Sequence, residues 1–278
     1  MKRLFALMIL SILMLAACGQ ETEDQTDDKQ INGGDSKEEV TLKVASLIPP
    51  MTEILELVAP QLKEEGIHLE MVVLSDNVQP NTALAAKEVD ANFFQHVPYM
   101  EEYNRSNDAN LVAIQEIYFA NYGVYSKNFE DIADLPEGAT IAIANDVSNI
   151  DRSLALLAQH DVIELKEKTG PYYTKSDITS NPKNYQFEEV DLLMLARMYD
   201  DADAVVMTPA YAAPLGLTPK SDALLSEGID YVFAITLVAR EDNKESEAIQ
   251  KLAEAMTSPE VKKFLEENYD ETAIPAFE

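Results

Sequence analysis

Two successive blocks of alternating strand-like and helix-like segments constrain the fold of this chain more than any other feature. In the first block, a β-rich run at residues 40–47 is followed, after a Pro-Pro break, by apolar residues at helical spacing over residues 52–63. The block continues with predicted strands at 68–74 and 90–95, helices at 80–89 and 97–103, and a long extended stretch at 111–125. Alternation of this kind predicts an α/β fold in which helices cover a largely parallel sheet.

The alternation restarts after residue 130, which indicates a second α/β unit. Here the sequence predicts strands at residues 140–144, 185–190 and 203–207, helices at 146–159 and 192–199, a long strand at 231–239, and closing helices at 244–256 and 259–268. The extended stretches 111–125 and 231–239 join the two blocks. We therefore expect two lobes with two crossover segments: residues 40–126 plus 231–278 form lobe one, and residues 127–230 form lobe two.

The composition argues against several function classes. A formal net charge of -29 disfavours nucleic-acid binding, because a phosphate backbone would be repelled. One cysteine rules out a disulfide framework, and the three histidines, His68, His96 and His160, offer little for a metal centre. No nucleophile elbow, P-loop, zinc-protease or dinucleotide-binding motif is present. We expect a binding protein without enzymatic activity or cofactor, whose ligand lies at the carboxyl ends of strands, in the cleft between the lobes.

The N-terminus carries the pattern of a bacterial lipoprotein signal. A short positive region precedes an apolar run at residues 4–15, which is too short to span a membrane comfortably and suits a signal peptide. The run ends in Leu-Ala-Ala-Cys, which resembles the lipobox whose cysteine is lipidated. We expect removal of residues 1–17, a lipid anchor on Cys18 at the extracytoplasmic face of the cell membrane, and an acidic flexible tether over residues 18–39. The alternative is an ordinary secretory signal with a chance cysteine.

Three stretches of the sequence resemble a known family. They are VQPNTALAAKEVDANFFQHVPY at residues 78–99, IAIANDVSNIDRSLALL at 141–157 and YAAPLGLT at 211–218. These stretches are similar to the NlpA/MetQ family of substrate-binding lipoproteins, the methionine-binding components of ABC importers. The resemblance implies a type II periplasmic-binding-protein fold, an amino-acid ligand in the interlobe cleft, and delivery of that ligand to an ABC permease with its ATPase subunits.

The helix predicted at residues 146–159 carries the candidate anchor for a ligand carboxylate. Arg152 lies in its first turns, where a helix N-terminus and a planar guanidinium can bind a carboxylate together. Position alone favours the alternative, in which Arg152 is a surface residue of an ordinary capped helix. The resemblance implies the binding role, because the family's carboxylate arginine occupies the matching place. Asn145 and Asn149 are either polar ligand contacts or helix caps.

An aromatic cluster follows the strand predicted at residues 90–95. Phe93 and Phe94 have the pattern of core residues, whereas His96 and Tyr99 are spaced to share one helix face. The resemblance implies that His96 and Tyr99 line the pocket for the apolar side chain of the ligand, and we count Phe94 with them. A metal-ligand role for His96 is the alternative.

The sequence departs from the family pattern at two positions of the expected pocket. Asn77 stands where the family usually has tyrosine, and Thr208 stands where it commonly has an asparagine that contacts the polar head of the amino acid. Met51 also replaces a frequent histidine. We therefore expect the ligand to be methionine, another amino acid or a dipeptide. A lipoprotein that binds a divalent metal and a surface interaction protein remain the alternatives.

Overall fold

The computed structural model describes residues 39–228 and 233–278. The predicted signal peptide, Cys18 and all but the last residue of the predicted tether lie outside the described residues. Residues 231 and 232, the start of the last predicted long strand, lie outside them as well. Within the described ranges, no helix is long and apolar enough to cross a membrane.

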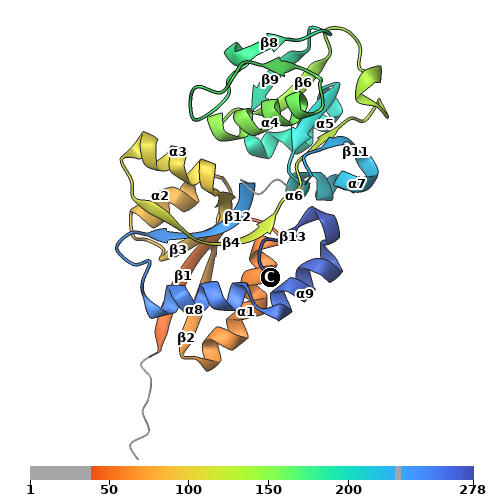
Figure 1. Cartoon of the computed structure of the whole chain (residues 1–278). Coiled ribbons are helices and arrows are strands. Elements are labelled where there is room, and N and C mark those ends of the chain that lie inside the picture. Colours follow the sequence, from red (N-terminus) through yellow and green to blue (C-terminus); the bar gives the residue numbers. More distant parts are fainter. Residues whose placement is uncertain (1–38, 229–232) are drawn as a thin grey trace, which may run out of the picture. The chain divides into compact units, whose positions relative to one another are not determined.

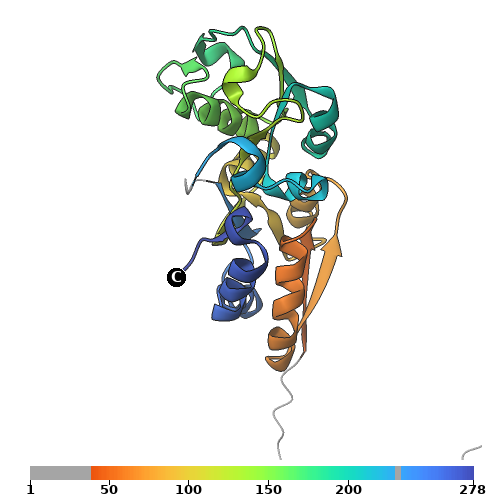
Figure 2. The same ribbon diagram turned by 90° about the vertical axis from the view of Figure 1, so that its right-hand side faces the viewer.

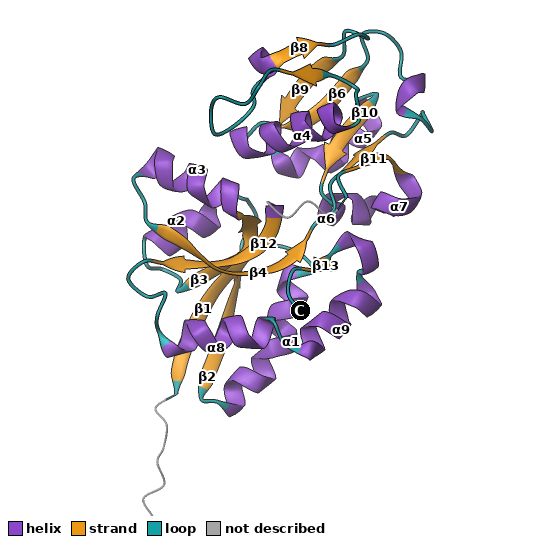
Figure 3. Ribbon diagram, in the orientation of Figure 1, coloured by secondary structure: helices purple, strands orange, loops and turns teal. Residues whose placement is uncertain are grey.

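A six-stranded mixed sheet forms the first lobe (Figures 1 and 3). In spatial order its strands are β13 (Ile274–Pro275), β4 (Leu111–Phe119), β12 (Ala234–Arg240), β3 (Ala91–His96), β1 (Val40–Ser46) and β2 (Ile67–Val73). The strands β2, β1 and β3 are parallel, as helical crossovers require, whereas β12 is antiparallel to both β3 and β4. The helices of this lobe are α1 (Met51–Glu64), α2 (Gln79–Ala85), α3 (Val97–Asn107), α8 (Glu247–Met256) and α9 (Pro259–Asn268).

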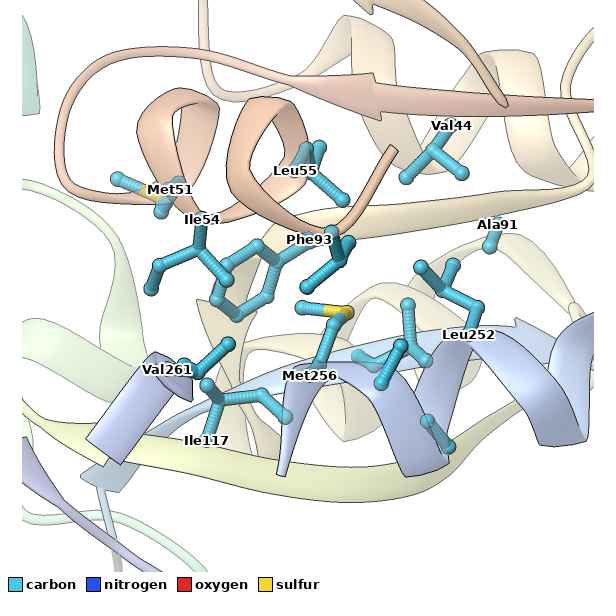
Figure 4. Close-up of a cluster of buried hydrophobic side chains, with 14 of the residues drawn as sticks. Val44, Met51, Ile54, Leu55, Ala91, Phe93, Ile117, Leu252, Met256 and Val261 are labelled. Carbon is cyan, nitrogen blue, oxygen red and sulfur yellow. The ribbon is translucent and has the colours of Figure 1, made fainter. Parts of the chain in front are cut away.

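Helices cover both faces of the first sheet. On one face, α1, α8 and α9 bury apolar side chains such as Ile54 against the strands, as Figure 4 shows. Figure 2 shows α1 alongside β2. On the other face, α2 and α3 bury Leu84 and Met100. Successive side chains of a strand point to opposite faces of the sheet. Val44 therefore packs with α1, α8 and α9, whereas its neighbour Ala45 packs with α2 and α3.

A five-stranded sheet forms the second lobe. In spatial order its strands are β11 (Ala223–Ser226), β5 (Gly123–Tyr125), β10 (Ala204–Met207), β6 (Thr140–Ala144) and β9 (Gln186–Val190). The strands β10, β6 and β9 are parallel, and β5 is antiparallel to β10 and β11. The helix α4 (Val147–Gln159) packs on one face, while α5 (Leu195–Asp201) and α6 (Pro209–Ala212) pack on the other. A short helix α7 (Pro219–Asp222) and a two-stranded ribbon of β7 (Glu164–Leu165) and β8 (Ile178–Ser180) complete the lobe.

The chain passes between the two sheets twice, and the connecting segments are hydrogen-bonded to each other. The backbone N–H of Glu227 donates to the carbonyl oxygen of Tyr122 at 2.9 Å, and that of Gly228 donates to Asn121 Oδ1 at 3.1 Å. The expected two-lobed α/β architecture with two crossovers is confirmed.

The first passage lies earlier in the chain than the sequence predicts. The extended stretch at 111–125 is divided, because β4 ends at Phe119 in the first sheet and β5 begins at Gly123 in the second. The chain therefore changes lobes before Gly123 rather than after Ser126. Apolar periodicity is alike in the two strands, so it does not reveal a change of sheet. The elements α6, α7, β11 and β13 were not predicted, since two to four residues carry too little periodicity.

Candidate ligand-binding site

A cavity of about 60 Å³ lies between the lobes. Residues at or directly after the ends of β1, β3 and β10 line it, which is where ligands of open α/β sheets are expected. The volume is room for roughly four to six water molecules, at about 10–15 Å³ for each. The structure brings together most of the predicted site residues on its walls, namely Asn77, Phe94, His96, Tyr99, Asn149, Arg152 and Thr208.

Asn145 is the predicted site residue that does not line this cavity. It follows β6 with an exposed side chain, and its backbone N–H donates to the carbonyl oxygen of Val190 at 2.8 Å. Phe93 is fully buried in the core of the first lobe, where its ring packs edge-on against Tyr118. Phe94, the next residue of β3, belongs to the same buried cluster and also lines the cavity. The pairing of β3 with β12 is irregular here, since Phe93 and Gln95 pair with consecutive residues of β12.

His96 ends β3 and begins α3, and its ring links the two lobes. Its Nδ1 accepts the backbone N–H of Tyr99 at 3.2 Å, so Nδ1 is unprotonated and Nε2 carries the hydrogen. Nε2 lies 3.2 Å from Asn149 Oδ1 and donates to it across the two lobes. Burial, and then the positive charge of Arg152, lower the pKa of His96 to about 4. His96 is therefore neutral near pH 7, and both ring nitrogens have protein partners.

Asn149 is held by the N-terminus of α4. Asp146 is the N-cap, and its carboxylate accepts the backbone N–H of Asn149 at 3.0 Å and the side-chain Nδ2 at 2.9 Å. The cap is therefore Asp146, while the amide of Asn149 bridges that cap to His96. This arrangement fixes the amide orientation and places Asn149 on the cavity wall.

Arg152 is buried in an ion pair with Glu227. Its side chain is 3% exposed and that of Glu227 is 8% exposed. Nε donates to the two carboxylate oxygens of Glu227 at 2.8 and 3.1 Å, and Nη2 donates to Glu227 and to the carbonyl oxygen of Ala120. The guanidinium carbon lies 4.2 Å from the ring centre of Tyr122 and 4.5 Å from that of Phe233. Much of the guanidinium fork expected to bind a ligand is thus occupied by the protein itself.

Aromatic and amide groups that were not predicted complete the walls. They are Gln95, Tyr118, Tyr122 and Tyr211. Tyr211 OH lies 3.4 Å from both polar atoms of the Asn77 amide, and Tyr99 OH donates to the Asn77 carbonyl oxygen at 3.0 Å. Burial raises the pKa of Tyr211 to about 12. Asn77 is therefore hydrogen-bonded to two tyrosines, Tyr99 and Tyr211, whose rings contribute to the same cavity wall.

The residues that sequence reasoning missed share a cause. Glu227 is one acid in a chain with 50 Asp and Glu residues, so nothing in its surroundings distinguishes it. Tyr118 and Tyr122 lie in and just after β4 and have the pattern of ordinary core aromatics. Tyr211 is the exception, since it belongs to the stretch YAAPLGLT that carried the family resemblance and could have been included on that ground.

A second set of contacts joins the lobes at α3. Tyr172 follows β7 in the second lobe, and its hydroxyl donates to the carbonyl oxygen of Pro98 in α3 at 2.8 Å. The guanidinium carbon of Arg105 lies 5.1 Å from the centre of the Tyr172 ring. The adjacent Tyr173 is held within its own lobe, where its backbone N–H donates to Asp151 at 2.7 Å. The lobes are therefore in direct contact at α3 as well as through the bond between His96 and Asn149.

Known proteins match this chain along almost its full length. The model of the NlpA lipoprotein family matches residues 42–277. The methionine-binding lipoprotein MetQ of Bacillus subtilis is 37% identical over 285 residues, which cover 100% of both chains. A solved nutrient-binding protein from Burkholderia cenocepacia bound to methionine is 36% identical with a TM-score of 0.82, over 85% of this chain and 100% of that one.

A third match concerns transport. A solved periplasmic substrate-binding protein of an ABC transporter from Coxiella burnetii is 35% identical with a TM-score of 0.80, over 84% of this chain and 100% of that one. The family match spans both lobes and the crossovers between them. This chain belongs to the NlpA lipoprotein family.

Proposed function

We propose that this protein is the substrate-binding lipoprotein of an ABC importer, which captures methionine or a related amino acid or short peptide and delivers it to the permease. The observation that carries the proposal is the cavity between two contacting lobes, with Arg152 on one wall and aromatic rings on the others. A relative that shares this fold has methionine bound. The function is capture and release, and we propose no covalent chemistry.

The geometry suits a small amphipathic ligand. Arg152 keeps Nη1 without a hydrogen bond to any described residue, which leaves N–H donors for a ligand carboxylate. Phe94, Tyr118 and Ile235 offer apolar surface for a side chain. The bond between His96 and Asn149 then holds the lobes together around the bound molecule.

We further propose that the mature protein is attached through a lipid on Cys18 to the extracytoplasmic face of the membrane. Membership of a lipoprotein family and the Leu-Ala-Ala-Cys sequence support this. Cell fractionation provides the test. Cys18→Ala should leave the protein unprocessed or release it from the membrane fraction, whereas anchoring like that of the wild type would contradict the proposal.

A thermal-shift scan of amino acids, dipeptides and divalent metals tests the binding function. A ligand that binds only the folded state raises the melting temperature by mass action. We expect methionine or a close relative to raise it, and isothermal titration to give a dissociation constant near or below micromolar, which corresponds to about -8 kcal/mol. If only divalent metals raise it, and EDTA reverses the shift, the amino-acid proposal is wrong.

A further inference from the structure

We propose that Glu227 sets the charge selectivity of the cavity, by compensating Arg152 so that the site accepts ligands of zero net charge and rejects simple carboxylate anions. This inference rests on the proposed function and narrows its ligand class to zwitterions. It assigns a specificity-determining role to a residue that does not itself line the cavity. The geometry of the ion pair carries the argument.

The hydrogen-bond donors of Arg152 are divided between protein and cavity. A guanidinium has five N–H donors. The Nε donor and both Nη2 donors are used by Glu227 and by the carbonyl oxygen of Ala120. Rings lie over the guanidinium at 4.2 and 4.5 Å. Among the described residues none accepts a hydrogen bond from Nη1, so a carboxylate bound at that edge shares Arg152 with Glu227 instead of replacing it.

The two charges of the buried ion pair at the cavity wall sum to zero. Arg152 is the one charged side chain among the described residues that line the cavity, because His96 is neutral. Glu227 lies directly behind Arg152 and supplies the opposite charge. Asp146 lies behind Asn149, where hydrogen bonds from Asn149 and Ser148 and the N-terminus of α4 compensate its carboxylate.

A ligand that carries only a carboxylate would therefore add an uncompensated negative charge to a buried site that already contains Glu227. Burying an unpaired charge is strongly unfavourable. A zwitterion brings its own ammonium group and leaves the sum at zero. Without Glu227, the same cavity would carry a net positive charge and would favour the anion.

Isothermal titration with two probes of the same carbon skeleton tests this. L-methionine is the zwitterion, and 4-(methylthio)butanoate is the same molecule without the amino group. We expect the wild type to prefer methionine by at least about 100-fold, and Glu227→Gln to reduce that preference by tenfold or more. Glu189→Gln removes one charge from the same lobe at a partly exposed pair with Lys175, and it should leave the preference unchanged.

The variant Glu227→Asp retains the charge and covers the case in which Glu227→Gln does not fold. It should keep most of the preference, and a loss as large as that expected for Glu227→Gln would show that side-chain length, not charge, is what matters and would overturn the inference. An unchanged preference in folded Glu227→Gln also overturns it. If the wild type binds 4-(methylthio)butanoate as tightly as it binds methionine, the inference fails while the proposed function stands. If no amino acid or dipeptide binds the wild type, the proposed function itself fails.

Discussion

The wall that the first lobe contributes to the cavity differs in charge from the wall contributed by the second. In the first lobe, His96, Tyr99 and Asn77 are uncharged and are held by hydrogen bonds, from the Tyr99 backbone N–H to His96 and from the Tyr99 hydroxyl to the Asn77 carbonyl oxygen. In the second lobe, Arg152 is held by a buried ion pair with Glu227, 75 residues further along the chain. The first wall relies on hydrogen bonds between neutral groups and the second on a buried ion pair, so the two should respond differently to substitution and to pH.

Breaking the ion pair should have the largest effect. Arg152→Met leaves Glu227 buried without a partner, so we expect a loss of about 3–5 kcal/mol in the free energy of unfolding. Arg152→Met combined with Glu227→Leu replaces both charges by apolar groups and should recover most of that loss. Urea denaturation measures both. If the single and double variants are equally destabilised, the unpaired charge of Glu227 is not the cause of the loss in the single variant.

The pH dependence of stability should sharpen the contrast at the first wall. The pKa of a histidine in the unfolded chain is near 6.5, and that of His96 in the folded protein is about 4. As the pH falls from 6.5 to 4, protons bind the unfolded state first. The folded state therefore loses about 3 kcal/mol of stability across this window, and the full contribution is present above pH 6.5.

The variant His96→Gln isolates this contribution. It should flatten the slope of unfolding free energy against pH between 4 and 6.5, relative to the wild type, whatever its absolute stability. Arg152→Met should retain a slope in this window, because His96 is still buried. If the unfolding free energy of His96→Gln depends on pH as steeply as that of the wild type, groups other than His96 cause the pH dependence.

The contact between Tyr172 and α3 should have a smaller effect. Tyr172→Phe removes the hydrogen bond to Pro98 and keeps the ring against Arg105. A hydrogen bond contributes about 0.5–1.5 kcal/mol, so we expect roughly two- to tenfold faster ligand release in stopped-flow experiments. Tyr173→Phe is the matched control, because the contacts of Tyr173 lie within its own lobe. Similar release rates in the two variants would argue against a role of Tyr172 in closure.

The smallest effect is expected at Asn145. Asn145→Ala should change ligand affinity less than about twofold, because the side chain is exposed and outside the cavity. Asn149→Ala, four residues later, removes the bridge between Asp146 and His96 and should weaken binding at least several-fold. Titration calorimetry measures the ligand affinity of both variants. Equal affinities for Asn145→Ala and Asn149→Ala would contradict the different roles assigned to the two asparagines.

Much of the fold was determined by patterns that act over a few residues. Alternation of strand and helix predicted both α/β lobes, and the ends of most long elements lie within a few residues of their predicted positions. The spacing of His96 and Tyr99 predicted that they share one helix face after a strand end, whereas their place at the pocket was implied by the family resemblance. The ends of helices and strands can be predicted in this way because they depend on hydrophobic periodicity and on capping residues, which are close together in the sequence.

The tertiary structure alone decided how those elements share the site. It divided residues 111–125 between two sheets, placed Glu227 against Arg152, and brought Tyr118, Tyr122 and Tyr211 to one cavity. Asn145 and Asn149 are indistinguishable as amides four residues apart, yet only Asn149 lies on the cavity wall. The physical reason is that an ion pair or a cavity wall depends on which surfaces are packed together. Residues that meet in this way have no characteristic separation in the sequence, so a single sequence does not reveal which of them will be in contact.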